Sequence, residues 1–168
     1  MADERNRTKT RLTNEQWGFS SNCFVCEPAN GAGLRIPFFH DHERDIVTAE
    51  FELTDAFSGA PSYVHGGVSL AVLDEVQAWA TIAVAGKFAV TTRTSAEFLR
   101  PVRVGKTYTL EGEVVSVDGD TIATVGRILD PRGEVRVQSE ATFLVLSAAI
   151  AADAIGEVSG DDTAFLRD

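Results

Sequence analysis

One segment of the chain constrains the fold more than any other. Residues 67–85 read GVSLAVLDEVQAWATIAVA, which is alanine-rich and apolar on nearly every face when drawn as a helix of about five turns. A helix that is apolar all round is usually buried on all sides, and Gly86 suits its C-terminal end. We therefore expect the rest of the chain to wrap around this helix.

Strand-like runs stand on both sides of the helix. Before it, apolar residues alternate along 34–38 and along 47–53, which favours a hairpin. After it come four runs separated by turn residues, and they cover residues 88–99, 107–117, 121–129 and 134–146. Sequential strands joined by tight turns predict an antiparallel meander. The predicted class is α+β, with a curled antiparallel sheet wrapped around one long central helix.

The length of the chain, 168 residues, predicts a single domain. We assign residues 1–20 to an N-terminal arm, 21–147 to the domain itself and 148–168 to a flexible C-terminal tail. The arm is polar apart from Trp17 and Phe19, which could dock it onto the domain. The tail is rich in alanine, aspartate and glycine, which favours a loose structure.

The charge of the chain argues against polyanionic partners. Asp and Glu number 25 against 15 Lys and Arg, a formal net charge of −10, so we expect neither nucleic acid nor an anionic membrane surface as a partner. No apolar run reaches the roughly 18 uncharged residues of a membrane span. The first 14 residues contain no apolar signal-peptide core. These observations predict a cytoplasmic protein.

Two carboxylates interrupt the apolar helix. Between Val68 and Gly86 the only charged residues are Asp74 and Glu75, and no Lys or Arg in the segment can pair with them. An unpaired buried charge is costly, and neighbours in a helix point about 100° apart. At least one carboxylate must therefore meet solvent, a ligand or another chain. The alternative is that both lie on a solvated seam of the helix.

The helix entry, His65-Gly66-Gly67, can bind a developing oxyanion, because the first N–H groups of a helix lack partners and carry its positive dipole end. The same three residues are also typical of an ordinary helix-start turn. Gly66 and Asp74 are about 12 Å apart along the axis, too far to act on one carbonyl within a chain. A joint role requires an antiparallel partner helix in a two-fold dimer.

Several motifs together resemble the hotdog-fold acyl-CoA thioesterases, specifically the phenylacetate-pathway and 4-hydroxybenzoyl-CoA thioesterase-like group. The resemblance runs from about Cys23 to Leu146. It is carried by the C-F-x-C-x-x-x-N-x-x-G-L segment, by the His65 helix entry with Leu73-Asp74-Glu75, and by Phe98-Leu99-Arg100-Pro101 with Gly105.

The resemblance implies roles for four catalytic residues. Asp74, nine residues after the histidine, would be the general base or nucleophile, and the Gly66 N–H of the opposite subunit would polarise the thioester carbonyl. His65 would organise the turn, and Thr91 would hold the water. Some relatives carry Asn or Gln six residues before the histidine, where this chain has Gly59.

On the substrate side we expect Gly67, Glu75 and three cations. Residues 76–110 carry five bases and one acid within a strongly acidic chain, and coenzyme A brings phosphates that a basic rim suits. The candidates are Arg100, Arg103 and Lys106, although each could also be an ordinary surface charge. Glu75 would be a supporting or structural residue, or less plausibly the true base.

The two cysteines form a single C-x-x-C at Cys23 and Cys26. A Cys2His2 metal set can be written with His40 and His42, but the spacing is short for a zinc finger and H-x-H is poor geometry. A redox pair needs a neighbouring βαβ pattern, which does not follow. We expect two small residues in a packed loop, with no metal and no cofactor.

The favoured function is hydrolysis of a medium acyl- or aryl-CoA to the free acid and coenzyme A. It requires a homodimer, and dimers could pair further into tetramers. A non-catalytic acyl-CoA-binding module on the same fold is the first alternative. A hotdog hydratase or dehydratase ranks last, because the only histidine near the helix opens its entry turn.

Overall fold

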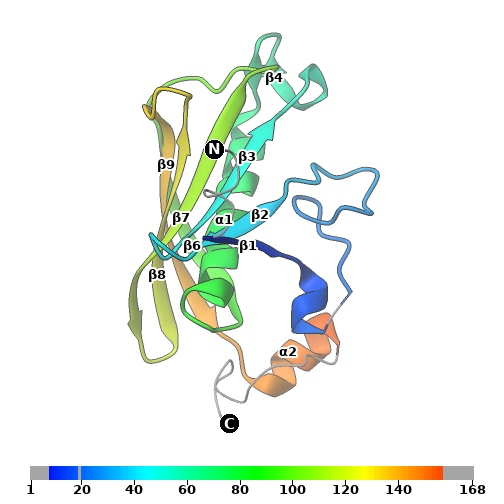
Figure 1. Ribbon diagram of the computed structural model, residues 1–168, viewed down its shortest axis with the longest axis vertical. Helices are drawn as coiled ribbons and strands as arrows, with labels where there is room; N and C mark the ends of the chain where they lie inside the picture. Colours follow the sequence, from blue (N-terminus) through cyan, green and yellow to red (C-terminus); the bar gives the residue numbers. More distant parts are fainter. Residues whose placement is uncertain (1–7, 19, 157–168) are drawn as a thin grey trace.

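A computed structural model describes residues 8–18 and 20–156 of the chain. A seven-stranded antiparallel sheet curls around helix α1 (Gly66–Ala83), which crosses its concave face (Figure 1). The predicted class, α+β with one long central helix inside a curled antiparallel sheet, is confirmed. No helix within the described residues is long and apolar enough to span a membrane.

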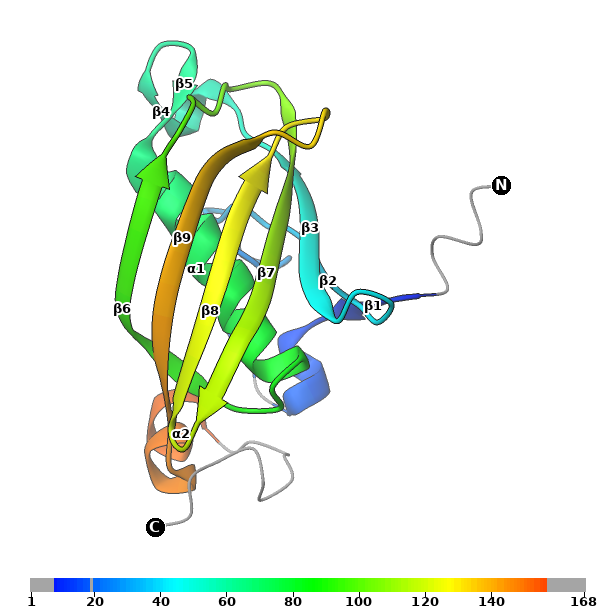
Figure 2. The same cartoon turned by 90° about the vertical axis from the view of Figure 1, so that its left-hand side faces the viewer.

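The strands do not pair in simple chain order. In the sheet they follow the order β1-β2-β3-β7-β8-β9-β6. Their bounds are β1 (Lys9–Leu12), β2 (Phe38–Asp41), β3 (Ile46–Glu52), β6 (Ala89–Phe98), β7 (Thr107–Asp118), β8 (Thr121–Leu129) and β9 (Val135–Val145). The predicted four-strand meander holds only for β7, β8 and β9. Strand β6 instead crosses to the far edge and pairs with β9, while β7 pairs with β3 (Figure 2).

Burial along the central strands explains how the sheet holds the helix. Along β8 every second residue is buried, from Ile122 to Ile128, which is the pattern of a strand with one face on the core. The helix contributes Val72, Leu73 and Val76, each at most 1 % exposed. The apolar run of α1 is therefore buried against the concave face, as its composition requires.

Two glycines let the helix approach the sheet closely. Gly112 on β7 and Gly126 on β8 are cross-strand partners. A Cβ atom on Gly112 would lie 2.5 Å from the carbonyl oxygen of Val76, and one on Gly126 would lie 2.9 Å from Nε2 of Gln77. Any larger residue would push α1 away from the sheet.

Gln77 holds α1 in register at the same place. Its side chain is fully buried, and Nε2 donates to the Leu73 carbonyl at 3.0 Å and to Oγ of Ser139 at 2.8 Å. Its Oε1 accepts from Oγ1 of Thr124 at 2.9 Å. Because every polar atom of this amide is near a partner, its burial carries little desolvation penalty.

Short elements surround this core. They are the 3-10 helices η1 (Asn14–Trp17) and η2 (Asp55–Phe57), the small hairpin β4 (Ser58–Ala60) and β5 (Tyr63–Val64), and helix α2 (Ala148–Ile155). The β4–β5 hairpin stands at the end of the molecule where α1 begins, and α2 lies at the opposite end (Figure 2).

Both terminal segments contain secondary structure that the sequence did not predict. In the arm, β1 adds to β2 at the sheet edge. The expected docking of Trp17 onto the domain is confirmed, since its ring lies 5.5 Å from that of Trp79 on α1. Phe19 lies outside the described residues. The expected loose tail begins instead as helix α2, whose first turn is capped by the Ser147 side chain. The proposed domain boundaries stay a prediction.

Candidate active site

Asp74 and Thr91 meet at one edge of the sheet. Asp74 projects from the middle of α1 toward β6, and Oγ1 of Thr91 donates a hydrogen bond of 2.6 Å to its Oδ1. Thr91 is exposed and Asp74 is half-buried. A carboxylate held by a hydroxyl donor keeps its second oxygen free for a proton or an electrophile.

The helix entry leaves one N–H group available. His65 caps α1, because its Nδ1 accepts from the Gly67 N–H at 2.9 Å while its carbonyl accepts from Val68 and Ser69. The Gly67 N–H, expected on the substrate side, is thus engaged by His65. The Gly66 N–H has no such partner within the described part of the chain, so it is the donor that a ligand can use.

Position 59, where the resemblance leads us to expect Asn or Gln in some relatives, has no room for a larger side chain. Gly59 lies on β4 directly against the cap: a Cβ atom there would lie 3.1 Å from Cα and 3.2 Å from Cδ2 of His65. A polar side chain at this position would require His65 to move. The absence of an amide at this position is therefore matched by the local packing.

A cavity of about 300 Å³ opens beside the helix entry. Gly66, Phe98, Leu99 and Arg100 line it, and the side chains of Phe98 and Leu99 are more than half exposed. A larger hollow of about 460 Å³ lies over β6 to β9, and its lining includes none of the predicted site residues. Of the two cavities, only the smaller one is lined by Gly66, whose N–H is unpaired within the described residues.

The three predicted cations differ in position. Arg100 lines the cavity with Gly66. The guanidinium of Arg103 stacks over the ring of Tyr63, another lining residue, at 5.2 Å from its centroid. Lys106 is exposed beyond the turn at Gly105 and is not among the lining residues. Of the three cations, Arg100 alone lines the cavity, and Arg103 contacts one of its lining residues.

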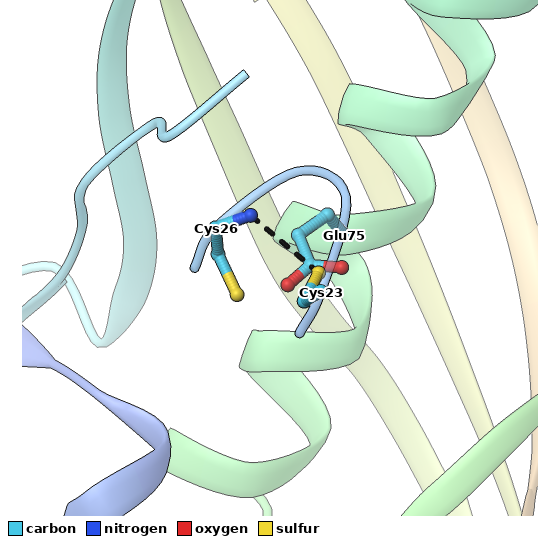
Figure 3. A group of neighbouring side chains, drawn as sticks. All are labelled: Cys23, Cys26 and Glu75. Carbon is cyan, nitrogen blue, oxygen red and sulfur yellow. Dashed lines mark hydrogen bonds between the residues drawn. The ribbon is translucent and has the colours of Figure 1, made fainter. Parts of the chain in front are cut away.

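Glu75 occupies a different environment from Asp74. Its carboxylate lies against the sulfur atoms of Cys23 and Cys26, and the ligand atoms of the three residues lie within 4.8 Å of one another (Figure 3). Burial, together with the nearby Cys23 sulfur, raises the pKa of Glu75 to about 8. Glu75 therefore does not join the Asp74–Thr91 pair.

The two thiols differ in acidity because of the loop around them. The Cys26 thiol donates to Cys23, and this hydrogen bond is the main reason that the pKa of Cys23 falls to about 5 while that of Cys26 rises. Backbone N–H groups of Val25 and Cys26 also donate to the Cys23 sulfur. The sulfur of Cys23 is thus built to carry negative charge.

His40 and His42 do not join the cysteines. His40 Nε2 lies 3.0 Å from Oδ1 of Asp45, and His42 Nε2 lies 2.8 Å from Oγ1 of Thr10. The Cys2His2 set that the sequence allows is therefore not assembled. Sequence reasoning missed the third member of the cysteine cluster, although Glu75 had been singled out as a carboxylate without a partner.

Comparisons with known proteins show what the chain is similar to. Residues 62–137 match the model of the thioesterase superfamily. Among solved structures, a thioesterase superfamily protein is 33% identical, with a TM-score of 0.69, over 73% of this chain and 60% of its own length. The chain thus spans less than two thirds of that relative. None of the curated proteins matches the chain.

Two further solved structures share the fold at lower identity. An acyl-CoA hydrolase from Staphylococcus aureus, in complex with butyryl coenzyme A, coenzyme A and coenzyme A disulfide, is 23% identical with a TM-score of 0.58, over 62% of this chain and 65% of its own. The PaaI protein of the phenylacetic acid degradation operon of E. coli is 20% identical with a TM-score of 0.55, over 59% and 75%. The hotdog fold predicted from the motifs is confirmed.

Proposed function

We propose that this chain, which is similar to the thioesterase superfamily, is an acyl-CoA thioesterase that hydrolyses a medium acyl- or aryl-CoA. The observation that carries the proposal is the Asp74–Thr91 pair, a carboxylate held by a hydroxyl group at the sheet edge. The binding of acyl-CoA by the hydrolase from S. aureus supports the substrate class.

In the proposed reaction Asp74 acts on water or on the substrate directly. As general base, it takes a proton from a water molecule whose oxygen attacks the thioester carbonyl carbon. The tetrahedral intermediate then expels the thiolate of coenzyme A, which is protonated as it leaves. As nucleophile, Asp74 would attack the carbonyl carbon and displace the thiolate of coenzyme A, and water would then hydrolyse the resulting mixed anhydride to the free acid. Thr91 orients the carboxylate in either route.

The carbonyl oxygen needs a donor that Asp74 of the same chain cannot provide. We propose that the Gly66 N–H of a second copy supplies it, with His65 fixing the turn through the Gly67 N–H. The eight residues between Gly66 and Asp74 place them about 12 Å apart along α1. An antiparallel pair of α1 helices would bring each Asp74 next to the partner subunit's Gly66.

Strand β6 supports such a dimer. It is the strand at one edge of the sheet, it is ten residues long, and most of its side chains are exposed. Phe98 and Val90 expose about half of their surface. A long strand with an open edge and exposed apolar residues is a template for pairing with another chain. Pairing of such dimers into tetramers stays a prediction.

The substrate would enter from the cavity at the helix entry. Arg100 and Arg103 would face the phosphates of coenzyme A there, with Lys106 farther along the same turn. The acyl group would lie between the two helices of the dimer, where small alanine side chains on α1 leave room. The expected cytoplasmic location stays a prediction.

One experiment tests the function. Release of free thiol is measured from a panel of acyl-CoAs with the wild type, with Asp74→Asn and with Glu50→Gln, an exposed control carboxylate on β3. We expect turnover that Asp74→Asn lowers at least about 10²-fold and that the control leaves unchanged. Tight acyl-CoA binding without thiol release from any substrate would instead favour the non-catalytic binding module. Water addition to an enoyl-CoA would favour a hydratase.

The dimer has its own test. Gel filtration or light scattering of the active protein should show an assembly of at least two chains. A stable monomer that still hydrolyses thioesters would contradict the cross-subunit geometry, while leaving the chemistry of Asp74 intact.

A further inference from the structure

We propose that Cys23, Cys26 and Glu75 form a binding site for one thiophilic divalent metal ion, best fitted by zinc. Each residue offers one ligand atom, and the three atoms lie within 4.8 Å of one another (Figure 3). Tetrahedral zinc with bonds of about 2.0–2.3 Å separates its ligands by about 3.5–3.8 Å. The ligand atoms must therefore approach one another by about 1 Å to reach these separations.

The loop around the cysteines carries donors that suit bound thiolates. The N–H groups of Val25 and Cys26 point at the Cys23 sulfur, at 3.3 and 3.5 Å. The side-chain amide of Asn14 approaches the Cys26 sulfur at 4.0 Å. Hydrogen bonds to the ligand atoms hold a metal site in its binding geometry before the ion arrives.

The same loop is fixed to the next segment of the chain. The Leu34 N–H donates to the Phe24 carbonyl at 2.7 Å, and the Ile36 N–H donates to the Val25 carbonyl at 2.9 Å. Gly33 permits this close approach, because a Cβ atom there would lie 2.5 Å from the Phe24 carbonyl oxygen. The two cysteines therefore sit on a rigid loop rather than on a free connection.

Beside the cluster there is room for a fourth ligand. Cys26 lines a cavity of about 210 Å³ together with Arg11, Asn14 and Trp79, and a water molecule there could complete the coordination. Two thiolates, one carboxylate and Zn²⁺ carry a net charge of −1, which the Arg11 guanidinium would offset. The buried indole N–H of Trp79 has no partner within the described residues, so it is a further donor in this cavity wall.

The donor set selects the kind of metal. Thiolates are soft ligands that favour zinc over magnesium or calcium, which require oxygen ligands. When the ion binds, the cysteine thiols release their protons and the loop becomes tied to α1 at the residue next to Asp74. The site does not depend on the proposed hydrolysis, and its test needs no measurement of activity.

The test uses the full-length protein, reduced and stripped of metal. Equilibrium dialysis against Zn²⁺ should give one ion per chain, and Co²⁺ should produce thiolate-to-cobalt charge-transfer absorption. Cys23→Ser and Cys26→Ser should each weaken binding at least about 100-fold, and Glu75→Gln at least about 10-fold. Glu27→Gln, which changes a carboxylate in the same loop, should bind as the wild type does.

The contrary outcomes are distinct. Wild-type protein that binds no Zn²⁺ at stoichiometric level refutes the site, and so does equal binding by either serine variant. Equal binding by Glu75→Gln refutes the three-ligand set. If the wild type instead binds no metal and forms a Cys23–Cys26 disulfide on mild oxidation, detected by loss of titratable thiols, the pair is a dithiol and not a metal site. A folded far-UV spectrum for each variant excludes unfolding as the cause.

Discussion

Asp74 and Glu75 are neighbours in one helix and yet belong to two different regions of the molecule. Asp74 faces the exposed edge strand and is bonded to a hydroxyl group. Glu75 faces the loop of residues 23–36 and lies against two sulfurs. The first environment keeps a carboxylate available for reaction. The second shields it partly from water and places it beside the Cys23 sulfur, which together raise the pKa of Glu75 to about 8.

The difference shows that the helix serves two purposes within one turn. The Asp74 side of that turn is not tightly packed, so its carboxylate can contact a ligand. The other side joins the helix to a rigid loop. Substitutions on the two sides should therefore affect different measured quantities, such as activity and the free energy of unfolding, and the following variants test that difference.

The largest expected effect is the separation of activity from stability at Asp74. Asp74→Asn should lower kcat at least about 10²-fold, equivalent to about 2.7 kcal/mol, while the free energy of unfolding changes by less than about 1 kcal/mol because the amide still accepts from Thr91. Thiol-release kinetics and urea denaturation measure the two quantities. A large loss of stability would show that Asp74 is a structural residue.

The next effect concerns the sheet that supports both regions. Gly112→Ala should lower the free energy of unfolding by about 2 kcal/mol, because the added methyl group meets the backbone of α1. Chemical denaturation measures it. Gly31→Ala is a matched control, since a Cβ atom at Gly31 meets nothing within 4 Å. Equal stability of both variants would mean that the helix has freedom to shift.

A smaller effect is expected at the hydroxyl group that holds Asp74. Thr91→Val should lower kcat about 10-fold, or about 1.4 kcal/mol, because the carboxylate loses its orienting donor. Thr92 lies next to Thr91 on β6, and its hydroxyl donates to the Thr142 carbonyl on β9. Thr92→Val should leave kcat within about twofold. If both variants lose the same activity, β6 as a whole is being disturbed and the pair has no special role.

The smallest effect comes from a third carboxylate in yet another environment. Asp130 accepts from two backbone N–H groups and from Arg136, and chiefly the Arg136 hydrogen bond holds the pKa of Asp130 below its usual value. Its stabilising contribution is therefore present at neutral pH and is lost as the pH falls through the lowered pKa, below about 4. Asp130→Asn should be slightly less stable than the wild type at neutral pH and equal to it in strong acid. Denaturation curves across that range, with Glu43→Gln as the control, test the sign.

The sequence predicted the central helix and most strands because periodicity and turn residues are local signals. The residues 121–129 form β8 as expected. The position of β6 was missed because nothing local distinguishes a strand that pairs with its successor from one that crosses the sheet. Such pairing is decided by the edges left open after β7 has joined β3.

The candidate site also divides into residues that local sequence signals predicted and residues whose partners come from distant segments. Motifs and resemblance pointed to Asp74, Thr91 and His65, which are close in the sequence. The partners of Glu75 and Gln77 were missed because they come from distant segments of the chain. A signal existed for Gln77, since an uncharged amide inside an apolar helix needs buried partners, and the serine and threonine on the inward faces of β8 and β9 could have suggested them.

The cross-strand pair Gly112 and Gly126 has a consequence for how such a protein can vary. These two glycines set the distance between α1 and the sheet at its centre, because neither has a side chain to separate them. Outer surfaces and loops can change without moving Asp74 relative to Thr91. A single methyl group between helix and sheet would move the Asp74 carboxylate away from the edge strand, so we expect the outer surfaces of this fold to vary more readily than the spacing between helix and sheet.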